Sequence, residues 1–295
     1  MTDAPAAPLL LRSVLFVPAA NRRALEKSAG LDADVLIFDL EDSAADSEKL
    51  AARERLAVHL AGAGRSARAL SILRINRLEE GGRDDLAALA DAPLDAVLLP
   101  KVESAEELQA LDAALASRPA TTAIWAMIET PRGIRRASEI AEASLSRPLG
   151  ALVVGPNDIV LAADLQLSDG RPQLVPWLME IVLAAKAANV AVIDGVYNDF
   201  RDEAGLLAEC RQARALGFDG KTLIHPAQIA AANAAFAPSP GDIAHAQAVV
   251  EAFEEPANHG KGVVAVEGRM VERLHLRQAE ALLARHRAIQ ERNHA

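Results

Sequence analysis

The chain has 295 residues, of which 51% are apolar, 24% charged and 3% aromatic. This length and apolar content suffice for a large core and exclude general disorder. Lys and Arg number 31 and Asp and Glu number 41, which gives a net charge of −10. An acidic chain disfavours unspecific binding to nucleic acid or to an anionic membrane, so an anionic ligand would need a local basic pocket.

The N-terminal sequence, MTDAPAAPLLLRSVLF, carries an early Asp and two prolines, and Arg12 interrupts its apolar stretch. It therefore lacks the features of a secretory signal, and no run of about 18 uncharged apolar residues follows. The single cysteine, Cys210, excludes an internal disulfide framework and a Cys-rich zinc site. We expect a cytoplasmic protein without a membrane span, in which Cys210 packs in a helix.

Short runs rich in Val, Ile and Leu recur along the chain, each followed by a turn and a segment with helical spacing. Because runs that are apolar throughout are typical of parallel strands covered on both faces, these repeats predict a closed (β/α)8 barrel, also called a TIM barrel. The alternative is an open doubly wound sheet, which the lack of a Gly-x-Gly-x-x-Gly turn after the first strand disfavours. The eight expected strands are Ser13–Pro18, Asp34–Leu40, Leu70–Asn76, Asp95–Pro100, Thr122–Glu129, Gly150–Gly155, Val190–Gly195 and Asp219–Pro226.

A break follows the last expected barrel helix, at the sequence APSPGD. We expect residues 1–237 to form the barrel and residues 238–295 to form a C-terminal extension, which exceeds the length of a minimal barrel. The extension is predicted to contain a helix (DIAHAQAVVEAFEE), a Gly-punctuated extended or lid-like segment, and a final basic helix (LRQAEALLARHRAIQER).

Catalytic groups of a (β/α)8 barrel lie at the carboxyl ends of its strands and in the loops that follow. An alternative for each polar residue there is a helix cap or an ion pair. For His225 a packing role is favoured, and Asp194 and Asp219, each followed by Gly, are interpreted as turn residues. The candidates at strand ends are Asp39, Glu41, Asp42, Arg74, Asn76, Lys101, Glu103, Glu129, Asn157, Asp158, Asp194 and His225.

Two of these carboxylates, Glu129 and Asp158, follow neighbouring strands and would meet at one side of the barrel mouth. Like charges held there repel unless a cation lies between them. Neither motif offers a His or Cys partner, and hard oxygen ligands favour Mg²⁺ or Mn²⁺ over zinc. The pair therefore predicts a site for one of these divalent metals.

Basic residues at two places suggest binding of anions. Arg74 stands inside an apolar strand and needs a partner, because a buried unpaired guanidinium is costly. That partner is either a substrate carboxylate, held bidentately, or a structural ion pair with Asp39 or Glu41. Arg23 and Lys27 open the first expected helix, where basic side chains could hold phosphate groups or simply be solvated.

Seven segments follow one another along the chain: RSVLFVPAANRRALEKS, FDLEDSA, LRINR, LLPKVES, AMIETPRGI, VVGPNDI and KTLIHPAQI. In this order they resemble the citrate lyase beta-subunit-like proteins, within the HpcH/HpaI aldolase and citrate lyase family. The resemblance runs from about Arg12 to the C-terminal helix. It implies a TIM barrel of the phosphoenolpyruvate/pyruvate-binding kind, usually a homotrimer or hexamer, that uses Mg²⁺ to cleave or form carbon–carbon bonds in acyl-CoA or acyl-carrier thioesters.

The same resemblance implies roles for residues of the barrel. Glu129 and Asp158 match the family's metal ligands, and Arg74 matches its substrate-carboxylate arginine. Arg23 and Lys27 lie where relatives contact the phosphates of CoA. The residues expected to contact the substrate are Arg74, Glu129, Pro156 and Asn157.

Two acidic residues are expected to act beside this set. Asp42 of LEDS matches an acidic residue near the metal. Towards the C-terminus, relatives often carry an Asp, followed by a proline, that is contributed to a neighbouring subunit's site. Here the segment reads GRMVERLH, so Glu272 stands in place of that Asp and the proline is absent.

The expected function is that of a Mg²⁺-dependent carbon–carbon lyase, which converts a thioester such as malyl-, citramalyl- or citryl-CoA into a keto acid and an acyl-CoA. Arg74 would neutralise the carboxylate, and Asp42, Glu272 from a neighbour or a metal-polarised water would move the proton. One alternative is a CoA-independent, metal-dependent pyruvate aldolase. A second is a non-catalytic barrel subunit of a lyase complex.

Overall fold

The computed structural model describes residues 8–42, 46–62 and 65–294. These residues form two compact units. The barrel unit comprises Leu11–Phe236, and the terminal unit comprises the chain from Ala237 onward with residues 8–10. No helix among the described residues has the length and apolar content that a membrane crossing requires.

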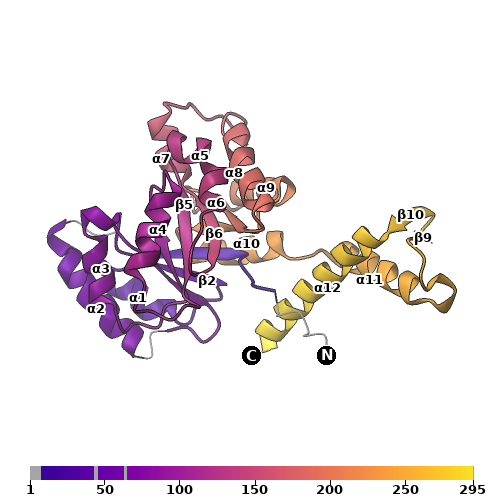
Figure 1. The fold of residues 1–295 in the computed structure, drawn as a ribbon, viewed down its shortest axis with the longest axis horizontal. Helices are drawn as coiled ribbons and strands as arrows, with labels where there is room; N and C mark the ends of the chain where they lie inside the picture. The colour runs from indigo at the N-terminus through magenta and orange to yellow at the C-terminus, as the bar shows by residue number, and fades with distance from the viewer. Residues whose placement is uncertain (1–7, 43–45, 63–64, 295) are drawn as a thin grey trace. The chain divides into compact units, whose positions relative to one another are not determined.

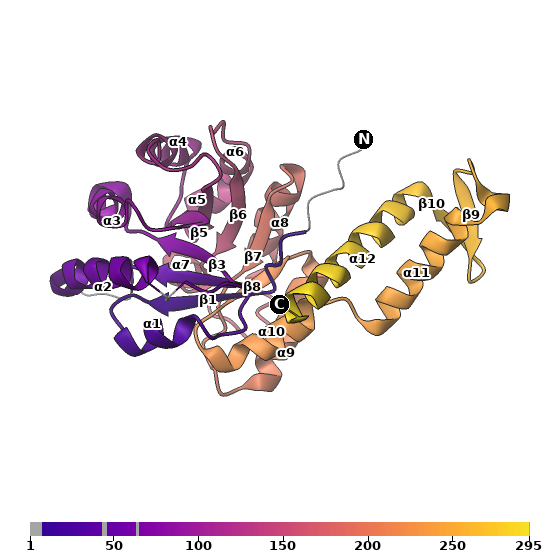
Figure 2. The same ribbon diagram turned by 90° about the horizontal axis from the view of Figure 1, so that it is seen from below.

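Eight parallel strands close into a barrel in sequence order, with β8 paired to β1; Figures 1 and 2 label several of these strands. Each lies within one of the eight predicted runs or differs from it by one residue, so the expected TIM barrel is confirmed. The strands are β1 (Ser13–Pro18), β2 (Val35–Asp39), β3 (Leu70–Arg74), β4 (Ala96–Leu99), β5 (Ala123–Ile128), β6 (Leu149–Val154), β7 (Ala191–Asp194) and β8 (Gly220–Leu223).

Helices surround the barrel and connect its strands (Figures 1 and 2). Several begin at a side chain that accepts a hydrogen bond from a backbone N–H of the first turn, such as Asn21, Ser104 and Asp202. The α-helices are α1 (Arg22–Ser28), α2 (Lys49–Ala61), α3 (Gly82–Ala88), α4 (Ala105–Ala114), α5 (Pro131–Arg135), α6 (Ala137–Ala141), α7 (Pro156–Ala162), α8 (Val175–Ala187), α9 (Glu203–Leu216) and α10 (Ile229–Phe236). Short 3₁₀ turns occupy Asp46–Glu48, Leu78–Glu80 and Pro226–Gln228.

Side chains of the strands alternate between the barrel interior and the surrounding helices. Both faces are buried, which explains why the strands read as continuous apolar runs. Cys210 packs in the outer core, as expected. A residue two positions beyond an interior side chain also points inward, so Asp39, Arg74 and Glu129 face the barrel mouth. The interior side chains include Val14, Val35, Ile37, Ile72, Leu98, Trp125, Met127, Val153 and Ile193.

A cluster of buried charges stabilises the outer wall where β7, β8 and α9 meet. Asp194 and Lys221 are both fully buried and lie 2.7 Å apart, and both oxygens of Asp194 accept hydrogen bonds from Arg171 at 2.9 Å. Lys221 also contacts Glu209 at 2.6 Å. Burial alone would raise the pKa of Asp194, but Lys221 and Arg171 lower it. Asp194 is therefore a structural ion-pair residue, and its interpretation as a turn residue is wrong.

The terminal unit has its own small core. Helices α11 (Pro240–Glu254) and α12 (Arg273–His294) lie side by side, as both views show (Figures 1 and 2). The antiparallel strands β9 (Val263–Val266) and β10 (Arg269–Glu272) lie at their ends, where β9 packs on α11 and β10 contacts α12. A 3₁₀ turn covers Pro256–Asn258. The predicted order of helix, extended segment and helix is observed. The boundary at residue 237 and a contact with a neighbouring subunit stay predictions.

Candidate active site

A cavity of about 260 Å³ opens at the carboxyl ends of the strands. Its volume suits a small organic acid better than a large ligand. Apolar and charged side chains share its lining, which includes Phe16, Asp39, Asp42, Arg74, Met127 and Asp158. The cavity therefore lies where the barrel fold places catalytic groups.

Arg74 is buried at the end of β3 and is held on one edge by Asp39. The two residues are direct neighbours on β3 and β2, and Nε and Nη2 of Arg74 donate to the two oxygens of Asp39 at 2.6 and 2.8 Å. The ring of Phe16 lies 4.8 Å from the guanidinium carbon. The ion pair with Asp39, one of the two predicted alternatives, is thus present.

The remaining edge of Arg74 faces other acidic groups. Its Nη1 lies 2.8 Å from Glu41 Oε2 and 3.2 Å from Asp42 Oδ2. Burial alone would lower the pKa of Arg74, but Asp39, Glu41 and Asp42 raise it, so the guanidinium stays charged. With Nε and Nη2 engaged by Asp39, Nη1 is the remaining donor of Arg74, and Glu41 and Asp42 already contact it. Asp39 therefore makes the bidentate contact with Arg74 that was expected for a substrate carboxylate.

Glu129 follows β5 and is 1% exposed. Its Oε1 accepts a hydrogen bond from the backbone N–H of Lys101 at 2.8 Å. Gly155 leaves room for the other oxygen, because a Cβ at that position would overlap the Glu129 carboxylate. Burial raises the pKa of Glu129 to about 8, and the charges of Asp158 and Glu41 add to this effect.

Asp158 lies in the first turn of α7 and lines the cavity. Its charge acts on Glu129, and Gly155, which adjoins the Glu129 carboxylate, lines the same cavity, so the two carboxylates lie on one side of the mouth. A buried acid that faces a second acid is stabilised by a cation between them, and hard oxygen donors suit Mg²⁺. Two carboxylates would leave the other coordination positions of Mg²⁺ to water and substrate; among the described residues no group of three or more acidic, His or Cys side chains is placed to hold a metal.

Lys101 and Glu41 form a second pair beside this site. Lys101 Nζ lies 2.6 Å from Glu41 Oε1. Burial alone would lower the pKa of Lys101, but the hydrogen bond and charge of Glu41 raise it. Lys101, Glu41 and Asp39 are all strand-end candidates of the sequence that the expected catalytic set does not include. For Asp39 the alternation of inward-facing residues along β2 is a further signal, because Asp39 lies two residues beyond Ile37.

Other predicted site residues lie at the rim. The side chain of Asp42 is 63% exposed and contacts Arg74. Pro156 and Asn157 line the cavity, although the amide of Asn157 pairs with that of Asn198 through hydrogen bonds of 2.8 and 3.3 Å.

Arg23, Lys27 and Glu272, which the sequence also predicts as site residues, are not part of the lining of the 260 Å³ cavity. Arg23 and Lys27 are exposed on α1. Glu272 ends β10 in the terminal unit, where its backbone N–H donates to His275 at 3.0 Å, and its place in a neighbouring site stays a prediction. His225, favoured as a packing residue, caps the turn that follows β8 and stacks on Phe200.

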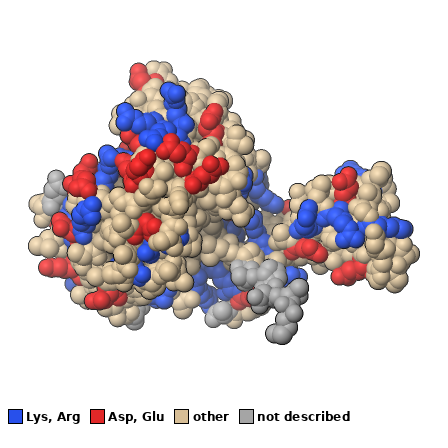
Figure 3. Space-filling model, in the orientation of Figure 1, with Lys and Arg blue, Asp and Glu red and all other residues tan. Residues whose placement is uncertain are grey.

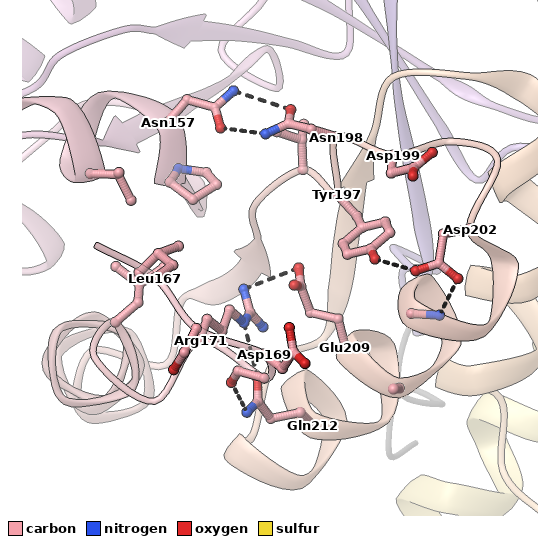
Figure 4. Close-up of a pocket in the computed structure, with 18 residues that line it drawn as sticks. Asn157, Leu167, Asp169, Arg171, Tyr197, Asn198, Asp199, Asp202, Glu209 and Gln212 are labelled. Atoms are coloured by element: carbon pink, nitrogen blue, oxygen red, sulfur yellow. Dashed lines mark hydrogen bonds and ion pairs between the residues drawn. The ribbon is translucent and has the colours of Figure 1, made fainter. Parts of the chain in front are cut away.

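A larger cavity of about 890 Å³ lies outside the strands, between α7, α9 and the loops before α8 and α9. Figure 4 shows Arg171 directed at Glu209 and the hydroxyl of Tyr197 directed at Asp202. The hydrogen bond to Asp202 raises the pKa of Tyr197 to about 12. Four acidic side chains line this cavity, Asp169, Asp199, Asp202 and Glu209, which disfavours binding of phosphate groups there.

Ion pairs connect many of the charged residues at the barrel surface. Figure 3 shows basic and acidic side chains next to one another on the visible face. One such pair joins Arg136 and Glu139, and another joins Arg132 and Glu103 at 3.4 Å. These pairs are compatible with a protein that binds a small anionic ligand at a local site.

Comparison with known proteins places the chain in a family. A model of the HpcH/HpaI aldolase/citrate lyase family matches residues 12–226. The chain belongs to this family. The match covers nearly all of the barrel unit and confirms the resemblance drawn from the seven sequence motifs.

Two relatives within this family match almost the whole chain. The (3S)-malyl-CoA thioesterase of Cereibacter sphaeroides is 46% identical over 280 residues, which cover 94% of this chain and 95% of the relative. The citrate lyase subunit beta of Escherichia coli is 38% identical over 282 residues, which cover 93% and 92%.

A solved family structure shares the fold. Protein CitE of Mycobacterium tuberculosis, in complex with magnesium, acetoacetate and coenzyme A, is 33% identical with a TM-score of 0.73. The match covers 92% of this chain and 97% of that protein. The terminal unit therefore belongs to the shared architecture as well as the barrel.

Proposed function

We propose that this chain is a Mg²⁺-dependent enzyme that cleaves or forms a carbon–carbon bond in a hydroxyacyl-CoA thioester such as malyl-, citramalyl- or citryl-CoA. The observation that carries the proposal is that Asp158 and Arg74 line one cavity at the barrel mouth, together with Gly155, which adjoins the carboxylate of the buried Glu129. A relative binds magnesium, a keto acid and coenzyme A together. The products of cleavage are a 2-oxo acid and an acyl-CoA.

Glu129 and Asp158 would hold the cation and leave its other positions to water and substrate. When bound, Mg²⁺ supplies positive charge that stabilises the oxygens of the hydroxy acid as it becomes a 2-oxo acid. The Lys101 N–H and the space above Gly155 fix the carboxylate of Glu129, so little reorganisation accompanies binding.

Arg74 would bind the carboxylate of the substrate through one of the two N–H bonds of Nη1, the other of which faces Glu41, because Asp39 engages Nε and Nη2. Phe16 and Met127 form apolar walls of the cavity and exclude water from the reacting carbons. The apolar walls strengthen the ion pair between Arg74 and the substrate carboxylate, because electrostatic attraction is stronger in a site of low dielectric constant.

Cleavage requires transfer of one proton. As the carbon–carbon bond breaks, the hydroxyl of the substrate loses its proton and the electron pair of the bond passes to the acyl-CoA fragment as an enolate, which then takes up a proton. Asp42 is the exposed acid beside Arg74 and is positioned to exchange protons with water. Glu272 of a neighbouring subunit is the second group proposed for this role.

Arg23 and Lys27 are proposed to bind the phosphates of CoA, because both are exposed on the helix that follows β1. Replacing both by Ala should raise KM for the thioester at least 10-fold, while Arg83→Ala, a change of an exposed arginine on α3, should not. An unchanged KM would favour a CoA-independent pyruvate aldolase.

A second candidate reaction is hydrolysis of (3S)-malyl-CoA, which the 46% identity to a (3S)-malyl-CoA thioesterase favours. The same Arg74 and metal-binding pair would hold the malyl group, but the thioester bond would break instead of the carbon–carbon bond. The products distinguish the two reactions, since a lyase releases glyoxylate and acetyl-CoA whereas a thioesterase releases malate and CoA.

The test is to incubate the purified protein with Mg²⁺ and each of the three thioesters and to separate the products. Glu129→Gln should abolish turnover, whereas Glu139→Gln, on an exposed side chain, should retain it. Absence of any product from all three thioesters would contradict both candidate reactions and leave the non-catalytic barrel subunit.

We also propose that the protein is a cytoplasmic homotrimer or hexamer in which Glu272 of the extension, residues 238–295, completes a neighbour's site. Arg74→Met and Glu272→Gln subunits, each inactive alone, should regain activity when mixed. Random mixing would restore about a quarter of the sites, because each needs its own Arg74 and a neighbour's Glu272. No recovery in a mixed oligomer would contradict the shared site.

A further inference from the structure

Lys101 combines two contacts that neither its main chain nor its side chain could supply alone. It follows β4 with a φ of 52°, a left-handed conformation that is costly for any residue except glycine. In this conformation its backbone N–H donates to Glu129 Oε1 at 2.8 Å, and its ammonium contacts Glu41 Oε1 at 2.6 Å. A single residue thus touches an acid of the metal-binding pair and an acid beside Arg74.

Glu41 is the acid whose position Lys101 and Arg74 fix. Its side chain is 10% exposed, and its charge acts on Glu129. Lys101 holds one of its oxygens, and Arg74 lies 2.8 Å from the other. Because Lys101 contacts both Glu129 and Glu41, the Glu41 carboxylate lies within the reach of one residue from the metal-binding pair and is a potential third ligand for a hard cation. If it bound the cation, it would occupy a position that the substrate oxygens require.

We propose that Lys101 is a positioning residue that keeps Glu41 paired with Arg74 and out of the coordination sphere of a cation held by Glu129 and Asp158. This inference rests on the proposed function, because it takes that pair as the metal ligands. Its main chain orients one ligand, and its side chain keeps the remaining coordination positions open.

The proposal is tested by calorimetric titration of the full-length protein at pH 8.5 with Mg²⁺ alone, and then with oxaloacetate or pyruvate in the presence of Mg²⁺. Lys101→Met removes the ammonium but keeps the N–H that binds Glu129. Freed Glu41 should then tighten Mg²⁺ binding about 10-fold and weaken binding of the 2-oxo acid about 10-fold. The double variant Lys101→Met with Glu41→Gln should lose the gain in Mg²⁺ affinity, because an amide binds the cation more weakly than a carboxylate.

Two further variants complete the design. Lys101→Gly suits the left-handed backbone and keeps the N–H, so it gives the same measurement if Lys101→Met does not fold. Lys186→Met is the matched control, since this lysine pairs with Asp219 at 2.8 Å at the opposite end of the strands. Lys186→Met should change neither the affinity for Mg²⁺ nor that for the 2-oxo acid.

The outcomes separate this inference from the proposed function. Weaker binding of both Mg²⁺ and the 2-oxo acid, or no change in either, in Lys101→Met and Lys101→Gly would overturn the role of Lys101. If Glu129→Gln left Mg²⁺ binding intact, the metal-binding pair itself would be wrong, and the proposed function would fail with it.

Discussion

Replacing Glu129 by Gln should stabilise the metal-free protein while abolishing its binding of Mg²⁺. In the absence of a cation the buried carboxylate faces Asp158, and burial raises its pKa from 4.5 to about 8. The native state therefore favours the neutral acid, whereas the unfolded chain releases the proton at ordinary pH. Gln has nearly the same shape as Glu but cannot ionise, so the variant avoids the free energy that burying an ionisable carboxyl costs the wild type.

The magnitude and its pH dependence follow from the two pKa values. Between pH 4.5 and 8 the native state binds a proton that the unfolded state does not, so the stability of the wild type falls as the pH rises. From 4.5 to 7 this amounts to 2.5 pH units at about 1.4 kcal/mol each, or about 3.5 kcal/mol at pH 7. For a unit of this size the difference corresponds to a melting temperature roughly 7–14 °C higher in the variant.

The assay is thermal unfolding in EDTA at pH 5, 7 and 8.5, repeated with excess Mg²⁺. The gap between Glu129→Gln and wild type should widen with pH in EDTA, and Mg²⁺ should raise the melting temperature of the wild type alone. Asp34→Asn is the contrasting control: its buried carboxylate is paired with Arg12 at 2.8 Å, so its loss should destabilise the protein. If Glu129→Gln melted below the wild type at pH 8.5 in EDTA, the reasoning about the buried acid pair would be refuted.

Three other substitutions test the surroundings of the site. Gly155→Ala should weaken Mg²⁺ binding at least 10-fold by calorimetry, because the new methyl group would displace the Glu129 carboxylate; unchanged affinity would contradict that placement. Asp39→Asn should lower the free energy of unfolding by about 3 kcal/mol and raise KM for the substrate, since Arg74 loses its orienting partner; a KM equal to that of the wild type would mean that Asp39 does not orient Arg74. Lys221→Met should lower the free energy of unfolding by a similar amount without changing the Mg²⁺ affinity, because its partners Asp194 and Glu209 lie in the outer wall. A large change in Mg²⁺ affinity would mean that this cluster is coupled to the metal-binding pair.

The barrel and the ends of its strands could be predicted because they depend on local patterns. Apolar runs marked the strands, and the carboxyl-end rule selected Arg74 and Glu129 before any contact was known. The partner of Arg74 could not be chosen in the same way. Asp39 is 35 residues away and becomes its neighbour only through the register of β2 against β3, which the pattern of apolar residues does not fix.

Two further features depend on tertiary structure in a similar way. The ion pairs of Asp194 reach Arg171 and Lys221, which are 23 and 27 residues away in sequence, so the residue was interpreted from its neighbouring Gly alone. The left-handed backbone of Lys101 could not be predicted from the sequence either, because Lys has no preference for that conformation. Its contacts with Glu129 and Glu41 offset the conformational free energy that this backbone costs.

The charges at the mouth imply an order of binding. Five carboxylates, Asp39, Glu41, Asp42, Glu129 and Asp158, lie around two cations, Arg74 and Lys101. Below about pH 8 the metal-free site keeps Glu129 neutral, so it has two more negative than positive groups and repels an anionic acid. A divalent cation displaces the proton of Glu129 when it binds, which leaves an excess of only one negative charge. The cation should therefore bind first. Titration with oxaloacetate should show at least 10-fold weaker binding in EDTA than in Mg²⁺, and equal affinity in both would mean that Arg74 alone recruits the substrate.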